Sequence, residues 1–323
     1  VTFLSRSAGV YREKRGFAPA PDLTRRAAAP YNPGMTRAID HLVLCVRDLD
    51  AARDFYRRLG FTLTPPALHP WGTGNSLAQM QGSFLEILAV VEKGKIAPPP
   101  AGGFGFGWFN ANFLEKREGF SMLVLQTQDA KADHAAFAAS GLDAHPPFYF
   151  ERKATLPGGG TATVAFTTAF VTDKRMPEAG FFTCQQHTPQ YFWKPEYQKH
   201  ANGAQGVVEI VMRAPDPAAF APFFAGLQGR DAVRTGKGRL DVTLGGGSLS
   251  VLDPAGIAQR YPGMEFAGAT DSPVFVGYRV AVPDLGAVEA LLKKNGIVAQ
   301  RIGDAVTIGP RDGFGAAIEF ARA

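Results

Sequence analysis

The 323-residue sequence has only two cysteines, Cys45 and Cys184, and no long apolar run. Two cysteines cannot form a disulfide framework, and Cys45 lies in an apolar stretch that predicts a buried thiol. Such a thiol is typical of a reducing compartment, so we expect a cytoplasmic protein. A membrane-spanning helix needs about 18 or more consecutive apolar residues, so we expect no membrane partner.

Clustered positive charge is also scarce over most of the chain. The formal net charge is +5, but residues 1–34 hold six Lys and Arg against two acids, which leaves +1 for the remainder. Nucleic-acid binding depends on basic patches. We therefore expect no nucleic-acid partner, and the sequence leaves open whether the protein forms a homodimer.

Residues 1–34 lack the apolar core of a secretory signal. They are rich in Arg and poor in acids, as transit peptides are. Met35 directly precedes the first strand-like run, which favours a second interpretation: upstream sequence translated from an early start codon. In both cases we expect a disordered leader.

One sequence unit occurs four times. Each copy combines an apolar strand, an acidic turn and a helix: "HLVLCVRDLDAARDFYRRLG" (41–60), "MLVLQTQDAKADHAAFAASG" (122–141), "EIVMRAPDPAAFAPFF" (209–224) and "GYRVAVPDLGAVEALLKKNG" (277–296). Alternating, β-branched runs follow each helix, as half-buried strands require. The repeats predict four βαβββ modules in an α+β fold, with the helices outside curled antiparallel sheets.

This arrangement resembles the vicinal oxygen chelate superfamily, which includes glyoxalases, extradiol dioxygenases and bleomycin-resistance proteins. The stretches "HPWGTGNSLAQMQGSFLEIL" (69–88) and "FFTCQQHTPQYFWKPEYQKHANGA" (181–204) are similar to the glyoxalase-like domain branch. The resemblance implies that two modules form one curled sheet around a cup.

Consecutive elements are usually neighbours in space, so modules one and two should pair, and likewise three and four. We therefore expect a first glyoxalase-like domain at 35–190, a linker at 191–206 and a second domain at 207–323. In an alternative pairing of module one with module three, His41, Glu86 and Glu209 would converge.

In metal-binding relatives the ligands come from the first and last strands of both modules in a cup. The matching positions of the first cup are His41, Glu86, Met122 and Cys184. Imidazole and carboxylate suit divalent Zn, Fe, Mn or Ni, whereas a thioether is a poor ligand for most of these. The resemblance thus implies a metal held by His41, Glu86 and Cys184, with Met122 as a departure from the pattern. The second cup, which offers Glu209, Ser250, Gly277 and Glu319, makes a weak transition-metal site.

Strand alternation predicts that Glu86 shares one face with Phe84 and Leu88. A buried carboxylate requires a cation or a hydrogen-bond donor. We therefore expect His41 and Glu86 to face each other inside the first cup. The alternative is a core histidine that is hydrogen-bonded to Glu86 without a metal.

Further candidates surround these two residues. In "HPWGTGNS" (69–76), His69, Trp71 and Asn75 offer donors and an aromatic wall for a substrate, or simply form a glycine-rich loop. Arg152 suits an anionic group, and His187 follows the last strand of the first cup. Residues 98–120 are either a connector or a lid over the cup.

Two functions compete at this point. One is a metal-dependent lyase, isomerase or dioxygenase that acts on a small oxygenated molecule, with Glu86 or Glu209 as the catalytic base. The other is a non-catalytic binding protein of the bleomycin-resistance type. His41 with Glu86 favours the enzyme, and Met122 favours the binding protein.

Overall fold

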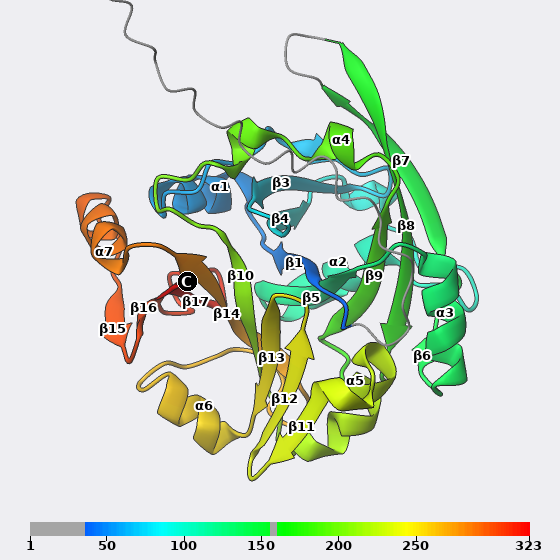
Figure 1. The fold of residues 1–323 in the computed structure, drawn as a ribbon. Helices are drawn as coiled ribbons and strands as arrows, with labels where there is room; N and C mark the ends of the chain where they lie inside the picture. Colours follow the sequence, from blue (N-terminus) through cyan, green and yellow to red (C-terminus); the bar gives the residue numbers. More distant parts are fainter. Residues whose placement is uncertain (1–35, 156–159) are drawn as a thin grey trace, which may run out of the picture. The chain divides into compact units, whose positions relative to one another are not determined.

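The computed structural model describes residues 36–155 and 160–323, so the predicted leader lies outside the described residues. Within the compact unit Tyr31–Ala323, the described chain forms two curled sheets, one from each half (Figure 1). Four modules build these sheets, three of them βαβββ and the second with one additional strand, which confirms the predicted α+β fold. Whether 35–190 and 207–323 fold as separate domains stays a prediction.

The first sheet contains nine strands, in the order β2-β3-β4-β1-β5-β9-β8-β6, with β7 paired to β8. Their bounds are β1 (Ile39–Cys45), β2 (Ala67–Leu68), β3 (Thr73–Gln79), β4 (Phe84–Val90), β5 (Gly119–Gln126), β6 (Asp143–Ala144), β7 (Phe148–Thr155), β8 (Thr161–Thr172) and β9 (Gly180–Gln186). The two modules meet at their first strands, because β1 and β5 pair antiparallel.

The second sheet repeats this arrangement with eight strands, in the order β11-β12-β13-β10-β14-β17-β16-β15. Their bounds are β10 (Gly206–Arg213), β11 (Val233–Gly236), β12 (Arg239–Leu244), β13 (Gly247–Leu252), β14 (Val274–Val282), β15 (Gln300–Ile302), β16 (Ala305–Ile308) and β17 (Ala317–Arg322). Modules one and two therefore pair, as do three and four. The alternative pairing of module one with module three is wrong.

The prediction of antiparallel sheets needs a correction, because both sheets are mixed. The first strand of each module pairs parallel with its last strand, as β1 does with β4 and β14 with β17. A parallel pair requires a crossover connection. The helix and the intervening strands of each module provide that connection, two strands in modules one, three and four and three strands in module two.

Each module carries a helix after its first strand, as the repeats predict. The helices are α1 (Leu49–Arg58), α2 (Phe106–Lys116), α3 (Ala130–Ala139), α4 (Pro189–Phe192), α5 (Ala221–Gln228), α6 (Pro254–Arg260) and α7 (Leu285–Lys294). Single 3₁₀ turns are η2 (Lys93–Lys95), η3 (Pro195–Gln198), η4 (Pro217–Phe220) and η5 (Arg230–Ala232). The aspartates of the acidic turns cap three of the repeated helices: Asp48, Asp129 and Asp284 accept hydrogen bonds from backbone N–H groups of the first turn.

The largest hydrophobic core contains residues from both sheets. Phe120 of β5 stacks on Phe275 of β14 with ring centroids 4.1 Å apart, and the buried hydroxyls of Tyr56 and Tyr278 lie 2.7 Å apart. The alternate residues of the first sheet, such as Val43, form a separate apolar cluster. One face of the sheet thus packs in the shared core, and the other lines the cup.

Among the described residues, no helix combines the length and the apolar character that a membrane crossing requires.

Candidate functional site

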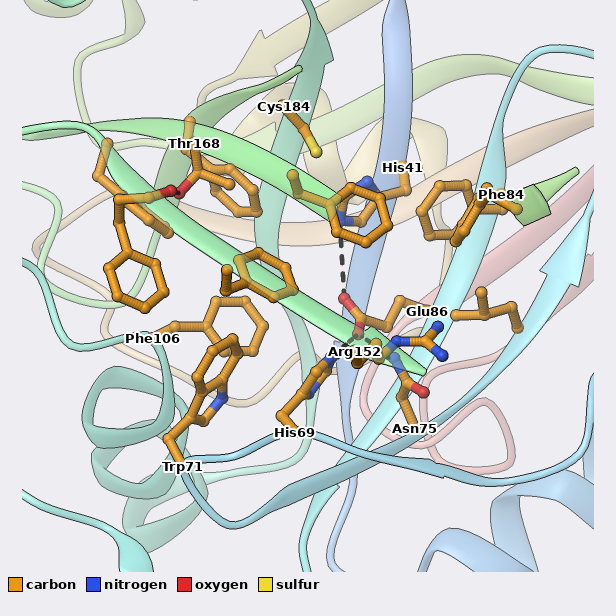
Figure 2. Close-up of a pocket in the computed structure, with 17 residues that line it drawn as sticks. His41, His69, Trp71, Asn75, Phe84, Glu86, Phe106, Arg152, Thr168 and Cys184 are labelled. Carbon is orange, nitrogen blue, oxygen red and sulfur yellow. Dashed lines mark hydrogen bonds and ion pairs between the residues drawn. The ribbon is translucent and has the colours of Figure 1, made fainter. Parts of the chain in front are cut away.

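A cavity of about 60 Å³ occupies the first cup (Figure 2). Its lining is mostly aromatic and comes from both modules. It consists of His41, His69, Trp71, Asn75, Leu77, Phe84, Glu86, Phe106, Phe148, Phe150, Arg152, Phe166, Thr168, Phe170, Phe182, Cys184 and Phe192. Apolar cavities with a few convergent polar groups are the usual form of a small-molecule site.

His41 and Glu86 face each other in this cavity, with His41 Nε2 3.6 Å from Glu86 Oε2. Alternation along β4 turns Glu86 to the cup side together with Phe84, while Leu85 belongs to the shared core. On β1 the pairing with β5 shifts by one residue between Ile39 and His41. Alternation along β1 places His41 on the same side as Val43 and Cys45, whereas Ile39, before the irregularity, belongs to the shared core. The predicted facing of the two residues is confirmed.

Glu86 is buried and receives a direct hydrogen bond. The Asn75 side-chain amide donates to Glu86 Oε1 over 2.6 Å, and His69 Nε2 lies 3.8 Å from the same oxygen. Asn75 Oδ1 is buried without a hydrogen-bond partner among the described residues. An unsatisfied acceptor of this kind is costly to bury, so it provides a ready contact for a donor on a ligand.

The far side of the His41 ring is held by a second carboxylate. His41 Nδ1 lies 2.6 Å from Asp40 Oδ1, and Gln186 donates to Asp40 Oδ2 over 2.9 Å. With the Nδ1 proton directed to Asp40, Nε2 of a neutral ring is an acceptor that faces another acceptor, Glu86. The arrangement is satisfied when a proton or a ligand donor lies between them.

His69 is a neutral histidine in the wall of the cavity. Burial lowers its pKa to about 4, although the nearby Glu86 carboxylate works in the opposite direction. Its ring stacks on Trp71 with centroids 4.8 Å apart, and its Nδ1 lies 2.9 Å from Thr73 Oγ1. The indole N–H of Trp71 is buried without an acceptor in the described part of the chain.

Arg152 reaches the cavity from β7. Phe148, Phe150 and Arg152 alternate on this strand, and all three line the cup. Burial lowers the pKa of Arg152, with a partial opposing effect from Glu86. Figure 2 shows Arg152 on the same side of the cavity as Glu86, His69 and Asn75.

The donor set in this cup fits a divalent metal poorly. Burial, together with Asp40 and Glu86, raises the pKa of Cys184 well above its ordinary value, whereas the metal-binding form of cysteine is the thiolate. Met122 packs against Gly180 with its thioether 3.9 Å from the Asn110 amide. Among the described residues, no three or more His, Cys, Asp and Glu side chains are grouped to hold a metal ion. The predicted ligand set of His41, Glu86 and Cys184 therefore lacks support from its arrangement.

Two predicted site residues do not line this cavity. Glu209 lies on β10 in the second sheet, where Arg260 donates to both of its carboxylate oxygens over 2.6 and 2.7 Å. Sequential pairing of the modules separates Glu209 from Glu86, so the two do not share a site. His187 is exposed, and its Nε2 lies 2.8 Å from Thr167 Oγ1. It is three residues after Cys184, an odd number, so alternation places it on the opposite side of the strand.

Other site residues were absent from the sequence prediction. Asp40 contacts the ring of the adjacent His41 and lies at the irregular pairing between β1 and β5. Phe166, Thr168 and Phe170 line the cup from β8. Their period of two in "TATVAFTTAFV" is a signal that could have placed them on one face. Phe106 lies at the start of α2, so the segment 98–120 contributes a helix to the cup wall.

Comparisons with known proteins agree with this architecture. The family model described as glyoxalase-like domain matches residues 39–227, more than half of the chain. The chain belongs to the glyoxalase-like domain family. This membership, within the vicinal oxygen chelate superfamily, confirms the predicted resemblance.

Solved structures share the fold of this glyoxalase-like protein at low sequence identity. A hypothetical protein from Staphylococcus aureus is 13% identical, with a TM-score of 0.62 over 88% of this chain and 99% of that one. A mutant 4-hydroxymandelate synthase from Streptomyces coelicolor is 12% identical, with a TM-score of 0.50 over 89% of this chain and 93% of that one. A search of curated proteins gave no match.

Proposed function

We propose that this glyoxalase-like protein is an enzyme of the lyase or isomerase type that moves a proton on a small oxygenated molecule bound in the first cup. Glu86 is the base. The observation that carries the proposal is the buried Glu86 carboxylate, which faces an aromatic cavity with the His41 and His69 rings 3.6 and 3.8 Å away.

The two oxygens of the Glu86 carboxylate have different roles. Asn75 donates to Oε1, so Oε2, on the side of His41, is the oxygen left to take a proton from the ligand. His41 Nε2 is the next acceptor, because Asp40 stabilises the positive ring that forms when His41 is protonated. Neutral His69 and the free Asn75 carbonyl remain to orient oxygen groups of the ligand. These steps use only residues of the chain.

The test is exchange of an acidic C–H proton in D₂O, followed by ¹H NMR. Phenylpyruvate and the hemithioacetal of phenylglyoxal with 2-mercaptoethanol are suitable probes. Each has a C–H next to a carbonyl group, and each also contains an aromatic ring. We expect exchange above the uncatalysed rate and a loss of about 10²- to 10⁴-fold in Glu86→Gln. Glu209→Gln, which removes the other predicted base, should keep the wild-type rate. An unchanged rate in Glu86→Gln contradicts the proposal.

A non-catalytic binding protein is the second candidate. Met122 favours it, since a buried thioether occupies a position that metal-binding relatives use for a ligand. This candidate predicts tight binding of a probe with no exchange above background in the wild-type protein. Metal analysis of the purified protein adds a separate check, because a stoichiometric transition metal would support a metal-dependent enzyme instead.

A further inference from the structure

We infer that the ligand of the first cup is an apolar carboxylic acid whose carboxylate is bound by Arg152 and whose body fills the aromatic cavity. This inference rests on the proposed function and specifies its substrate class. It starts from the position of Arg152, which lines both the aromatic cavity and a second cavity beside it. Leu77 and Phe192 are the other residues common to both, so these three side chains form the neck between the two cavities.

Arg152 carries a positive charge without a direct partner in the described part of the chain. Among the residues that the structure describes, no carboxylate lies within 4.0 Å of its guanidinium, and no hydrogen bond from it is formed. By contrast, Arg260 of the second cup pairs with Glu209 and Glu319 at 2.6 and 2.9 Å. A partly buried guanidinium without an anion is costly. A planar carboxylate ligand would satisfy it with two parallel hydrogen bonds.

The rest of the cavity suits the apolar part of such a ligand. Phe148 and Phe150 precede Arg152 on the same face of β7, so the cation and two aromatic rings point into one space. Phe166, Phe170 and Phe182 add further rings at distances typical of aromatic packing, for example 4.4 Å between the centroids of Phe170 and Phe182. An aryl or short alkyl group fits this wall, and a strongly polar body does not.

The two charged groups also fix where the reacting carbon lies. Glu86 and Arg152 line the same cavity, and among the described residues the two do not form an ion pair. A ligand carboxylate on Arg152 therefore places the carbons next to it between Arg152 and Glu86. Anchoring one end of the ligand in this way positions a C–H for the base.

A competing explanation is that Arg152 merely offsets the charge of Glu86 across the cavity. In that case the arginine would affect neutral and anionic ligands alike through the shape and charge of the cup. The two explanations differ in one measurable property, the preference of the site for a carboxylate over a neutral ligand of the same shape.

The experiment is isothermal titration calorimetry of the full chain with phenylacetate, 3-phenylpropionate and the neutral phenylacetamide, all at one ionic strength. We expect at least one of the two acids to bind more tightly than the amide. Arg152→Met, which keeps most of the side-chain volume, should weaken binding of that acid by about tenfold to a hundredfold. Binding of the amide should change little, and Arg152→Lys should retain part of the preference. The matched control is Lys153→Met on the same strand, because Lys153 is exposed and does not line the aromatic cavity.

Equal binding of amide and acids by the wild-type protein would overturn the inference and leave the proton-transfer proposal intact. Equal losses for acid and amide in Arg152→Met would also overturn it, in favour of the competing explanation. If none of the three compounds binds, the carboxylic-acid class is wrong, and the separate exchange experiment on Glu86 still decides the proposed function.

Discussion

Glu86 shows how much the local sequence can predict about one residue. Alternation along "GSFLE" places it on the face of Phe84, and the cost of burying a carboxylate predicts a donor opposite it. Both expectations agree with the structure, where Asn75 and the two histidines surround it. The donor that actually bonds Glu86 is Asn75, eleven residues earlier on a different strand, and strand pairing decides that.

His69 leads to a prediction about the pH dependence of stability. Its pKa is about 4 in the folded protein against 6.5 for an ordinary histidine, because burial disfavours the charged ring. Between pH 6.5 and 4 His69 is protonated in the unfolded chain but not in the folded chain, and this difference favours unfolding. Neutral His69 therefore carries no such penalty above pH 6.5, where the protein has its full stability. As the pH falls toward 4, the free energy of unfolding decreases by up to about 3 kcal/mol.

Urea unfolding between pH 7.5 and 4.5 tests this expectation. The free energy of unfolding should fall less steeply in His69→Gln than in the wild-type protein. Burial also lowers the pKa of His200, so a residual slope is expected in that variant. His187→Gln is the control, because this histidine is exposed and should leave the slope unchanged. A wild-type slope in His69→Gln would show that His69 is not the group responsible.

At the scale of single elements, the four repeated helices of the modules, α1, α3, α5 and α7, differ in how their N-termini are capped. Asp129 accepts hydrogen bonds from the N–H groups of Lys131 and Ala132, both at 3.0 Å, and thereby caps α3. Asp216 is the equivalent residue of the third module, but its side chain makes no cap hydrogen bond, and a 3₁₀ turn precedes α5. The acidic turn is therefore the same in sequence and different in structure.

These two aspartates make a matched pair for measuring the cap. Asp129→Ala should lower the free energy of unfolding by about 1 kcal/mol, because it leaves two N–H groups of the first turn without their acceptor. Asp216→Ala should cost less than about 0.5 kcal/mol, as an exposed substitution without such a role does. Chemical denaturation of both variants is the measurement. Equal costs would mean that the cap hydrogen bonds contribute nothing at Asp129.

At the scale of the whole molecule, the two cups have different contents. In the second cup Arg260 bonds both Glu209 and Glu319, and Arg279 also pairs with Glu319. The carboxylates that a metal would need are therefore already engaged. Burial would raise the pKa of Glu209, but hydrogen bonds from Arg260 and Ser250 hold it below its ordinary value.

We expect this network to stabilise the fold and to have no part in ligand binding. Arg260→Met should lower the free energy of unfolding by about 2 kcal/mol or more, because the Glu319 side chain is only 3% exposed and loses one of its two partners. Binding of a probe in the first cup should not change. Arg239→Met, which removes a surface pair with Asp241, should cost less than about 1 kcal/mol. Lost binding in a folded Arg260→Met protein would contradict this division between the cups.

The sequence by itself determined the number of modules, the position of their helices and the inward face of Glu86. These features depend on local periodicity and on repetition, both of which are visible in one dimension. It did not determine the parallel pairing of first and last strands, the separation of Glu209 from Glu86, or the contact of Asp40 with His41. Those depend on which strands pair and on a shift in register, and the same alternating pattern is compatible with more than one pairing. The convergence of Arg152, His69 and Asn75 on Glu86 likewise arises only when two modules close around one cavity.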